Sequence, residues 1–186
     1  MKVILFNISS RDAIDNFSKT VIQGILRHQI ASLLSFAPTM IPSKQDRIRL
    51  WGTKTGPRNI SLWRRVSSGD LALYCRKSKI VALAVIAGIE RNRRVARHLW
   101  GEQPDGSTWE LLYFLSEVIE TQIDLSVFNQ AIGYARFYVP RGLLIVDQAR
   151  LLALSQETGD LKSLLLRLGK RKLAQGPDQE REPSPT

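Results

Sequence analysis

Hydrophobic side chains recur along the chain at two spacings, and these predict both strands and helices. The apolar run at residues 3–6 predicts a first strand, and residues 9–34 repeat apolar positions at helical spacing, which predicts one amphipathic helix. Residues 47–51 alternate polar and apolar side chains, as a strand with one wet face does. Two further strands are predicted at residues 71–75 and 80–90, joined by a basic turn.

The rest of the chain alternates strands with short helices. Strands are predicted at residues 108–115 and 142–146, and helices at residues 60–66, 94–100, 124–133, from 147 onward and 161–169. This order indicates an α+β fold, with a mostly antiparallel sheet or small barrel and helices packed outside it. We expect one domain at residues 1–169. Residues 170–186 have little to bury and end in prolines, which predicts a disordered tail or linker.

Positive charge is concentrated in one part of the chain. The net charge is +10, and residues 44–79 hold ten Lys or Arg against two Asp. Residues 91–97 add four arginines, whereas residues 101–124 hold six acids and no Lys or Arg. Basic domains prefer polyanions, of which nucleic acid is the commonest. The segregation of charge favours a binding face over uniform solubilisation.

Residues that could carry catalysis or hold a metal do not occur at productive spacings. The loop at residues 52–59 has two glycines but lacks the Lys-Ser/Thr ending of a phosphate-binding loop. His28 and His98 are too far apart in sequence for a zinc hydrolase motif, and the single Cys75 excludes an internal disulfide. We therefore expect no catalytic residue, metal or cofactor. No apolar run reaches the ~20 residues of a membrane span, and a cytoplasmic location is expected.

Four tryptophans flank turns that contain glycine. Trp51 and Trp63 stand on either side of the basic loop, and Trp100 and Trp109 on either side of residues 101–107. An indole at the junction of a strand and a loop can stack on a nucleobase, which is worth roughly 1–3 kcal/mol. The other interpretation is that each indole fills the core. The sequence favours core for Trp63 and Trp109, and leaves both interpretations open for Trp51 and Trp100.

Three stretches resemble a known family. They are WGTKTGPRNISLW (51–63), SSGDLALYCRKSKIVALAVIAGI (67–89) and RHLWGEQPDGSTWELLYFL (97–115). Their order and spacing are similar to those of the EVE and YTH-like domains of the PUA superfamily. They are most similar to the modified-base-reading domains at the N-terminus of McrB-type, modification-dependent restriction proteins. The resemblance covers residues 1–150 and implies a small, curved β-barrel that opens into an aromatic cage for a flipped, methylated base.

The same resemblance implies which side chains form the cage. Trp51 matches a family tryptophan after the second strand, and Trp100 matches one in the later loop. A third wall is not evident between them. Trp109, Tyr74 and Leu99 are the candidates for it.

Polar and basic side chains have expected roles around the cage. Asn7 and Ser10 match the positions from which the family's first strand reads the edge of the base. Basic side chains neutralise backbone phosphates without reading sequence. The phosphate-binding residues expected here are Arg58, Arg64, Arg65, Lys77, Lys79, Arg93 and Arg94.

These observations predict a protein that binds DNA carrying a modified base, either N6-methyladenine or a modified cytosine, by flipping that base into the cage. On this hypothesis the chain is the targeting module of a restriction system, and a nucleotide-driven motor and a nuclease are its partners. Three alternatives stay open: an RNA-binding module on the same fold, a small nuclease with an unfamiliar site, and a scaffold whose basic patch meets an acidic protein.

Overall fold

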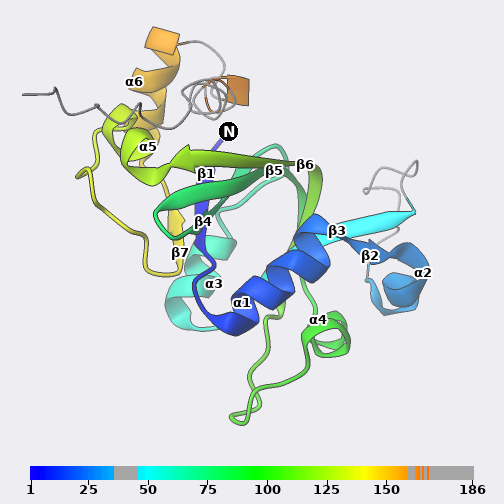
Figure 1. Ribbon diagram of the computed structural model, residues 1–186. Helices are drawn as coiled ribbons and strands as arrows, with labels where there is room; N and C mark the ends of the chain where they lie inside the picture. The colour runs from blue at the N-terminus through cyan, green and yellow to red at the C-terminus, as the bar shows by residue number, and fades with distance from the viewer. Residues whose placement is uncertain (36–45, 159–161, 164, 166, 168–186) are drawn as a thin grey trace, which may run out of the picture.

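The computed structural model describes residues 1–35, 46–158, 162, 163, 165 and 167, which form an α+β fold around a seven-stranded sheet (Figure 1). Neighbouring strands follow the order β2–β3–β6–β5–β4–β1–β7. Among these described pairs, β1 and β4 run parallel and the others antiparallel. The strands are β1 (Val3–Asn7), β2 (Ile25–Leu26), β3 (Arg47–Thr53), β4 (Leu71–Arg76), β5 (Lys79–Arg91), β6 (Leu111–Asp124) and β7 (Leu143–Ile145).

Helices cover both faces of this sheet. α1 and η1 cross one face and pack with α3 on a common core, whereas α5 and α6 pack on the other (Figure 1). A third cluster joins α2 and α4 to the far side of β3 and β6. The helices are α1 (Arg11–Asn16), the π-helical η1 (Phe17–Ile22), α2 (Arg27–Ile30), the 3₁₀ turn η2 (Ala31–Leu33), α3 (Pro57–Trp63), α4 (Arg93–Trp100), α5 (Leu125–Ala131) and α6 (Gln148–Thr158).

The side chains of β1 alternate between two cores. Val3 and Leu5 pack in the core beneath α5 and α6, whereas Ile4 and Phe6 pack in the core beneath α1. This follows from the two-residue period of a strand, in which successive side chains point to opposite faces. Asn7 ends the strand and is only partly buried, so β1 delivers a polar side chain to the boundary of the second core.

The α+β class and the mostly antiparallel sheet are confirmed, but the sheet does not close into the expected barrel. In the described residues the edge strands are β2 and β7, and each pairs with a single neighbour. Register shifts between β5 and β6 bend the long central strands, as β-bulges do. The edge strands span two and three residues, which is too little backbone to join the two ends of the sheet.

The single helix predicted for residues 9–34 is wrong beyond its first half. Its start is as expected, because Ser10 caps α1 by accepting a hydrogen bond from Ala13 N at 3.2 Å. Gly24 then adopts φ +73°, a left-handed conformation that ends a helix, and the next two residues pair with β3. The apolar spacing continued past Gly24 because α2 presents its own buried face. The predicted tail at residues 170–186 lies outside the described residues.

Cys75 gives a prediction about this core. Its side chain is 2% exposed, and burial raises the pKa of the thiol to about 12. At pH 8 the native thiol should react with a maleimide roughly a thousandfold more slowly than the unfolded chain, whose thiol has the ordinary pKa of ~8.5. Because the folded pKa is raised, the thiol's contribution to stability is complete below pH ~8.5 and declines above it. Native-state reaction as fast as that in denaturant would contradict this packing.

Candidate nucleic-acid interface

A cavity of about 380 Å³ opens where β1 and β3 end, beside the start of α3. This volume is within the usual range for small-ligand sites. Segments distant in sequence meet there. The last residues of β1 and of β3 line the cavity, together with the residues that lead into β7. The lining residues are Phe6, Asn7, Ser10, Ala13, Trp51, Gly52, Thr53, Lys54, Arg58, Asn59, Trp109, Arg141, Gly142 and Leu143.

Trp51 both lines this cavity and belongs to the core. Its side chain is 5% exposed and stands edge-on to Phe6 and Tyr74, with ring centroids 6.2 and 5.7 Å away. The indole Nε1 is buried and has no hydrogen-bond partner among the described residues. An unpaired buried N–H is costly, roughly 1–3 kcal/mol. Trp51 therefore offers a fixed aromatic surface and an unused donor at one site.

Gly52 separates the two indoles that were expected to face each other. Trp51 lies on one side of β3, and the ring of Trp100 packs against the other side, where a Cβ on Gly52 would meet Trp100 Cζ3 at 2.4 Å. The same Cβ would lie 2.4 Å from the carbonyl oxygen of Trp109. Trp100 is therefore not part of the cavity lining, but it supports Trp109, whose ring stands edge-on to it at 6.4 Å.

Polar groups complete two sides of the cavity. Asn7 Nδ2 donates to Pro140 O at 2.9 Å, which fixes the orientation of the amide because a carbonyl can only accept. Its Oδ1 is therefore the acceptor of a residue that lines the cavity. Ser10 also lines the cavity, where its hydroxyl already caps α1. Asn59 donates to Lys54 O at 2.9 Å and so closes the loop between β3 and α3.

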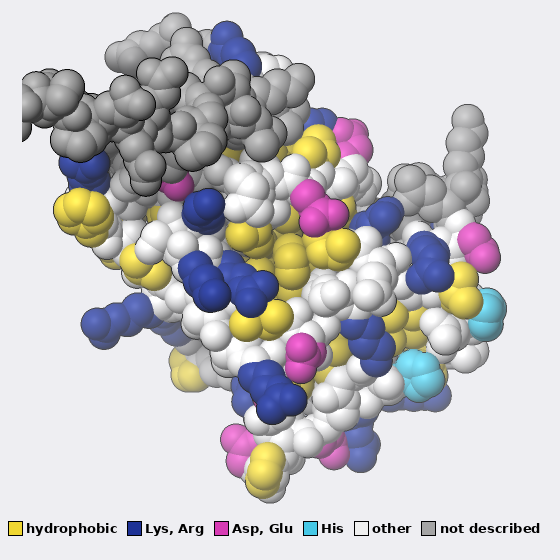
Figure 2. Space-filling view, in the orientation of Figure 1, with side chains coloured by type: hydrophobic (Ala, Val, Ile, Leu, Met, Phe, Trp, Pro, Cys, Tyr) yellow, Lys and Arg dark blue, Asp and Glu magenta, His cyan; other side chains and the backbone are white. Residues whose placement is uncertain are grey.

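Three cations surround the opening, and the described lining contains no carboxylate. They are Lys54, Arg58 and Arg141. Lys54 Nζ stands 5.1 Å from the centroid of the Trp109 ring, a cation–π contact. Arg58 is exposed, and its Nη2 donates to Leu143 O at 3.4 Å, which ties α3 to β7. On the face drawn in Figure 2, blue Lys and Arg side chains outnumber magenta acidic ones.

The structure brings together five of the residues selected from sequence and separates the others. Asn7, Ser10, Trp51, Arg58 and Trp109 line the cavity. The remaining candidates do not line this cavity.

Two proposed walls are core residues. The Tyr74 side chain is fully buried and stacks on Phe6, with ring centroids 5.4 Å apart. The Tyr74 ring is therefore not exposed to the cavity. Burial also raises the pKa of its hydroxyl. Leu99 is 6% exposed and packs in the cluster beneath α4. Neither residue lines the cavity, whereas Trp109, the other candidate for a wall, does.

Most of the proposed phosphate-binding residues lie away from the cavity. Arg64 and Arg65 are exposed where α3 ends. Lys77 lies in the β4–β5 turn, and Lys79 begins β5. Arg93 and Arg94 begin α4. Arg93 is paired with Glu102 at 2.8 Å, and this hydrogen bond raises the pKa of the guanidinium and lowers that of the carboxyl. Part of the basic charge is therefore neutralised locally.

Sequence reasoning missed three of the lining side chains. Lys54 and Asn59 stand in the stretch that carried the resemblance, so their place between the two tryptophans was an available signal. Arg141 had no signal of this kind. It reaches the cavity only because β7 pairs with β1, which is a contact across more than 130 positions.

Other kinds of site are not found in the described part of the chain. No group of three or more His, Cys, Asp or Glu side chains converges there in a way that could hold a metal ion. None of its helices is long and apolar enough to cross a bilayer.

Comparison with solved structures identifies the fold. The chain superposes on the N-terminal domain of Thermococcus gammatolerans McrB bound to m5C DNA with a TM-score of 0.64 and 17% identity, covering 89% of this chain and 99% of that one. This likeness confirms the EVE/PUA-like fold that the resemblance implied. No protein-family model matches the chain, and no curated protein matches it.

Two further structures are more distantly similar. Human THYN1 in complex with DNA containing 5-methylcytosine gives a TM-score of 0.39 and 11% identity, covering 86% of this chain and 99% of that one. Protein Atu2648 from Agrobacterium tumefaciens gives 0.38 and 10%, covering 86% and 94%. At these scores neither structure carries an argument about this chain.

The close approach at Gly52 generates a prediction. Gly52→Ala should lower the free energy of unfolding by about 1–3 kcal/mol, because the new methyl group must displace Trp100 and the backbone of Trp109. Denaturant unfolding measures this. Gly88→Ala is the matched control, since Gly88 is also a strand glycine and a Cβ there meets nothing within 4 Å. Equal stabilities of the two variants would show that β3 and Trp100 are not in contact.

Proposed function

We propose that this protein binds DNA carrying a modified base, and that the cavity between β1, β3 and α3 takes that base after it has flipped out of the duplex. The observation that carries the proposal is the aromatic cavity itself, with Trp51 as its floor, Trp109 as a wall and three cations at its opening. Flipping a base out of its stack costs a few kcal/mol of free energy, and contacts in the cavity must offset this cost.

Aromatic contacts provide the first part of this compensating free energy. Stacking on an aromatic side chain contributes roughly 1–3 kcal/mol per base. Trp51 is held rigidly by Phe6, Phe17 and Tyr74, so little conformational entropy is lost when a ring packs against it. Trp109 is the more exposed of the two indoles. A base inserted between them would be enclosed on two sides.

Hydrogen-bonding groups provide the second part of the free energy that offsets base flipping. Trp51 Nε1 is a buried donor without a partner among the described residues, and Asn7 Oδ1 is an acceptor. A base edge that offers both an acceptor and an amino group satisfies both. Cytosine and adenine have such edges, and an added methyl group would bury further apolar surface worth roughly 0.8 kcal/mol. The DNA bound by the McrB domain carries m5C, which favours a modified cytosine over N6-methyladenine here.

The cations supply affinity that does not depend on sequence. Lys54, Arg58 and Arg141 stand around the opening, where the phosphates on either side of a flipped nucleotide would pass. Each phosphate neutralised releases condensed counterions, so binding should weaken steeply with salt. The exposed Arg64, Arg65 and Arg94 would extend this field without touching the base.

The wider role follows from the same proposal. The chain would act as the targeting module of a modification-dependent restriction system in the cytoplasm, with a motor and a nuclease as its partners. The fold shared with the McrB N-terminal domain supports this. Co-purification of the chain with the products of neighbouring genes is the direct test, and a chain that never associates with a nucleotide-hydrolysing protein would contradict it.

Binding to matched duplexes tests the proposed ligand. A duplex with one 5-methylcytosine should bind roughly fourfold or more tightly than its unmodified counterpart at equal salt, given the apolar area of one methyl group. An N6-methyladenine duplex and an RNA of the same sequence complete the panel. Equal affinities for modified and unmodified DNA would remove the modified-base proposal, and tighter binding of the RNA would replace it with the RNA-binding alternative. Cleavage of any member in Mg²⁺ would favour the nuclease.

Trp109 is the better residue for testing the cage, because Trp51 also stabilises the core. Trp109→Ala should weaken binding of the modified duplex severalfold through lost stacking, and so reduce its advantage over the unmodified duplex, whose base enters the cavity less often. Trp51→Ala should instead lower the free energy of unfolding by about 3–5 kcal/mol. Circular dichroism melting separates the two effects. Unchanged selectivity in a folded Trp109→Ala protein would exclude the cavity as the base site.

Arg58 and Arg64 form a matched pair for the phosphate contacts. Both are exposed arginines on or beside α3, but only Arg58 lines the cavity. Arg58→Ala should reduce the slope of log affinity against log salt by about one unit, and Arg64→Ala by less. Titrations at several salt concentrations give both slopes. A larger change for Arg64→Ala would place the DNA track along the end of α3 instead.

A further inference from the structure

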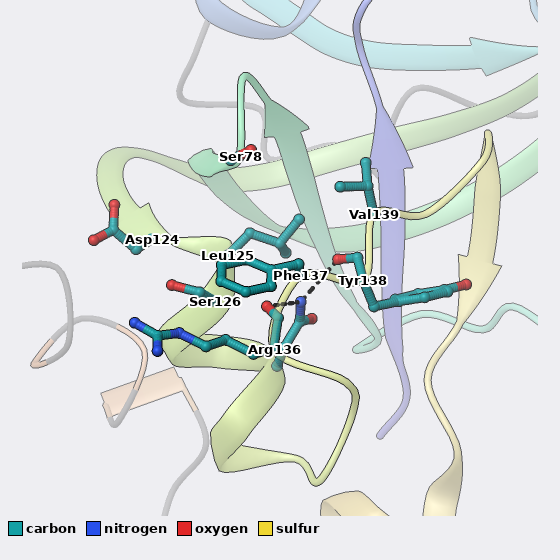
Figure 3. Close-up of a pocket in the computed structure, with 9 residues that line it drawn as sticks. Ser78, Asp124, Leu125, Ser126, Arg136, Phe137, Tyr138 and Val139 are labelled. Atoms are coloured by element: carbon teal, nitrogen blue, oxygen red, sulfur yellow. Dashed lines mark hydrogen bonds between the residues drawn. The ribbon is translucent and has the colours of Figure 1, made fainter.

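A second cavity, of about 240 Å³, lies between the β4–β5 turn, the start of α5 and the chain that leads from α5 to β7 (Figure 3). Of the residues in and beside this cavity, only Lys77 and Lys79 were expected from the sequence to bind phosphate. Its apolar side is formed by Leu125, Phe137 and Val139, and its polar side chains include Ser126 and Asn129. Phe137 is 81% exposed, an unusual position for a phenyl ring.

Asn129 is the feature that indicates a ligand. Its side chain is 1% exposed, and Nδ2 donates to Arg136 O at 3.1 Å and Tyr138 O at 2.8 Å. Both partners are carbonyls, so the amide cannot be turned over. Its Oδ1 is then a buried acceptor with no partner among the described residues. Buried polar atoms are seldom left unpaired, and a bound group with an N–H would satisfy this one.

The surrounding charge restricts which donor can enter. Arg136 lines the cavity, and Lys77 and Lys79 flank Ser78 in the adjacent turn, against the single carboxylate of Asp124. A cationic donor such as a lysine or arginine side chain would meet like charges here. An anionic molecule that carries a neutral amino group avoids this repulsion. The N–H of the amino group can face Asn129, while the negative charge elsewhere on the molecule faces the cations.

From this geometry we infer that the second cavity binds a nucleotide whose base carries an exocyclic amino group. The base lies against Phe137, its amino group donates to Asn129 Oδ1, and its phosphate is held by Arg136 and the lysines of the turn. Exposed aromatic side chains beside arginine are a recurrent platform for bases. This binding does not require a modified base and does not depend on the cavity lined by Trp51.

The place of the cavity in the fold supports nucleic acid as one source of that nucleotide. Val139 lines the second cavity and Arg141 lines the first, and two residues of chain span at most about 7 Å. Asn7 pairs with Cys75 at the end of β1, close to the turn that carries Ser78. The end of β1 and the chain before β7 therefore lie beside both cavities, and one strand of DNA could reach each of them. A free mononucleotide is the other source.

Calorimetric titration of the full chain with two mononucleotides tests the inference. Deoxycytidine monophosphate should bind saturably and at least about fivefold more tightly than deoxyuridine monophosphate, which has a carbonyl in place of the amino group. Phe137→Ala should weaken this binding roughly fivefold or more through lost stacking, and the high exposure of Phe137 means that the variant should fold. Val127→Ala is the control, because Val127 is also an exposed apolar side chain but lines neither cavity, and this variant should leave mononucleotide binding unchanged. Equal binding of the two nucleotides, or binding unaffected by Phe137→Ala, would overturn the proposal.

A second measurement identifies the source of the nucleotide. If the ligand is part of a strand, Phe137→Ala should weaken binding of an unmodified oligodeoxycytidine more than it weakens binding of the mononucleotide. If the ligand is free, the two losses should be equal. The selectivity between methylated and unmodified duplexes should survive in Phe137→Ala, so failure here is distinguishable from failure of the proposed function. Absence of saturable binding by either ligand would overturn the proposal outright.

Discussion

The candidate site depends on the close contact between the backbone of β3 and the indole of Trp100. Gly52 has no side chain, so Trp100 can lie against one side of the strand while Trp51 projects from the other. The contact also holds the chain at Trp109, whose carbonyl approaches the same glycine. Because Gly52 has no side chain, Trp51 and Trp109, which are distant in sequence, can both line one cavity.

Alternation of polar and apolar residues was enough to predict the fold class and most of the strands, because a strand with one buried face has an apolar side chain at every second position. Three features were beyond it. The helix after β1 ends at Gly24 for a conformational reason that apolar spacing does not encode. Closure of the sheet depends on edge strands of two and three residues, too short to produce a pattern. The β6 strand also continues to Asp124, well past its apolar start.

For the site, sequence could select aromatic and basic residues but not say which of them share a surface. Asn7, Trp51 and Trp109 were placed together because the resemblance supplied three-dimensional order that spacing lacks. Tyr74 and Leu99 were reasonable candidates by residue type, and only burial separates them from Trp109. Arg141 illustrates the opposite failure, since its neighbours in space come from the first strand and its neighbours in sequence show nothing unusual.

The double membership of Trp51, in the core and in the cavity, divides the protein into parts that evolution can change at different rates. If the cavity binds the base as proposed, a substitution of Trp51 alters stability and ligand binding together, so few replacements there would survive selection on either property. Lys54, Arg58, Trp109 and Arg141 lie at the opening and contribute little to the two large cores. A new ligand preference can be acquired at these outer positions while the folded state persists, which allows one scaffold to diversify its targets without first being rebuilt.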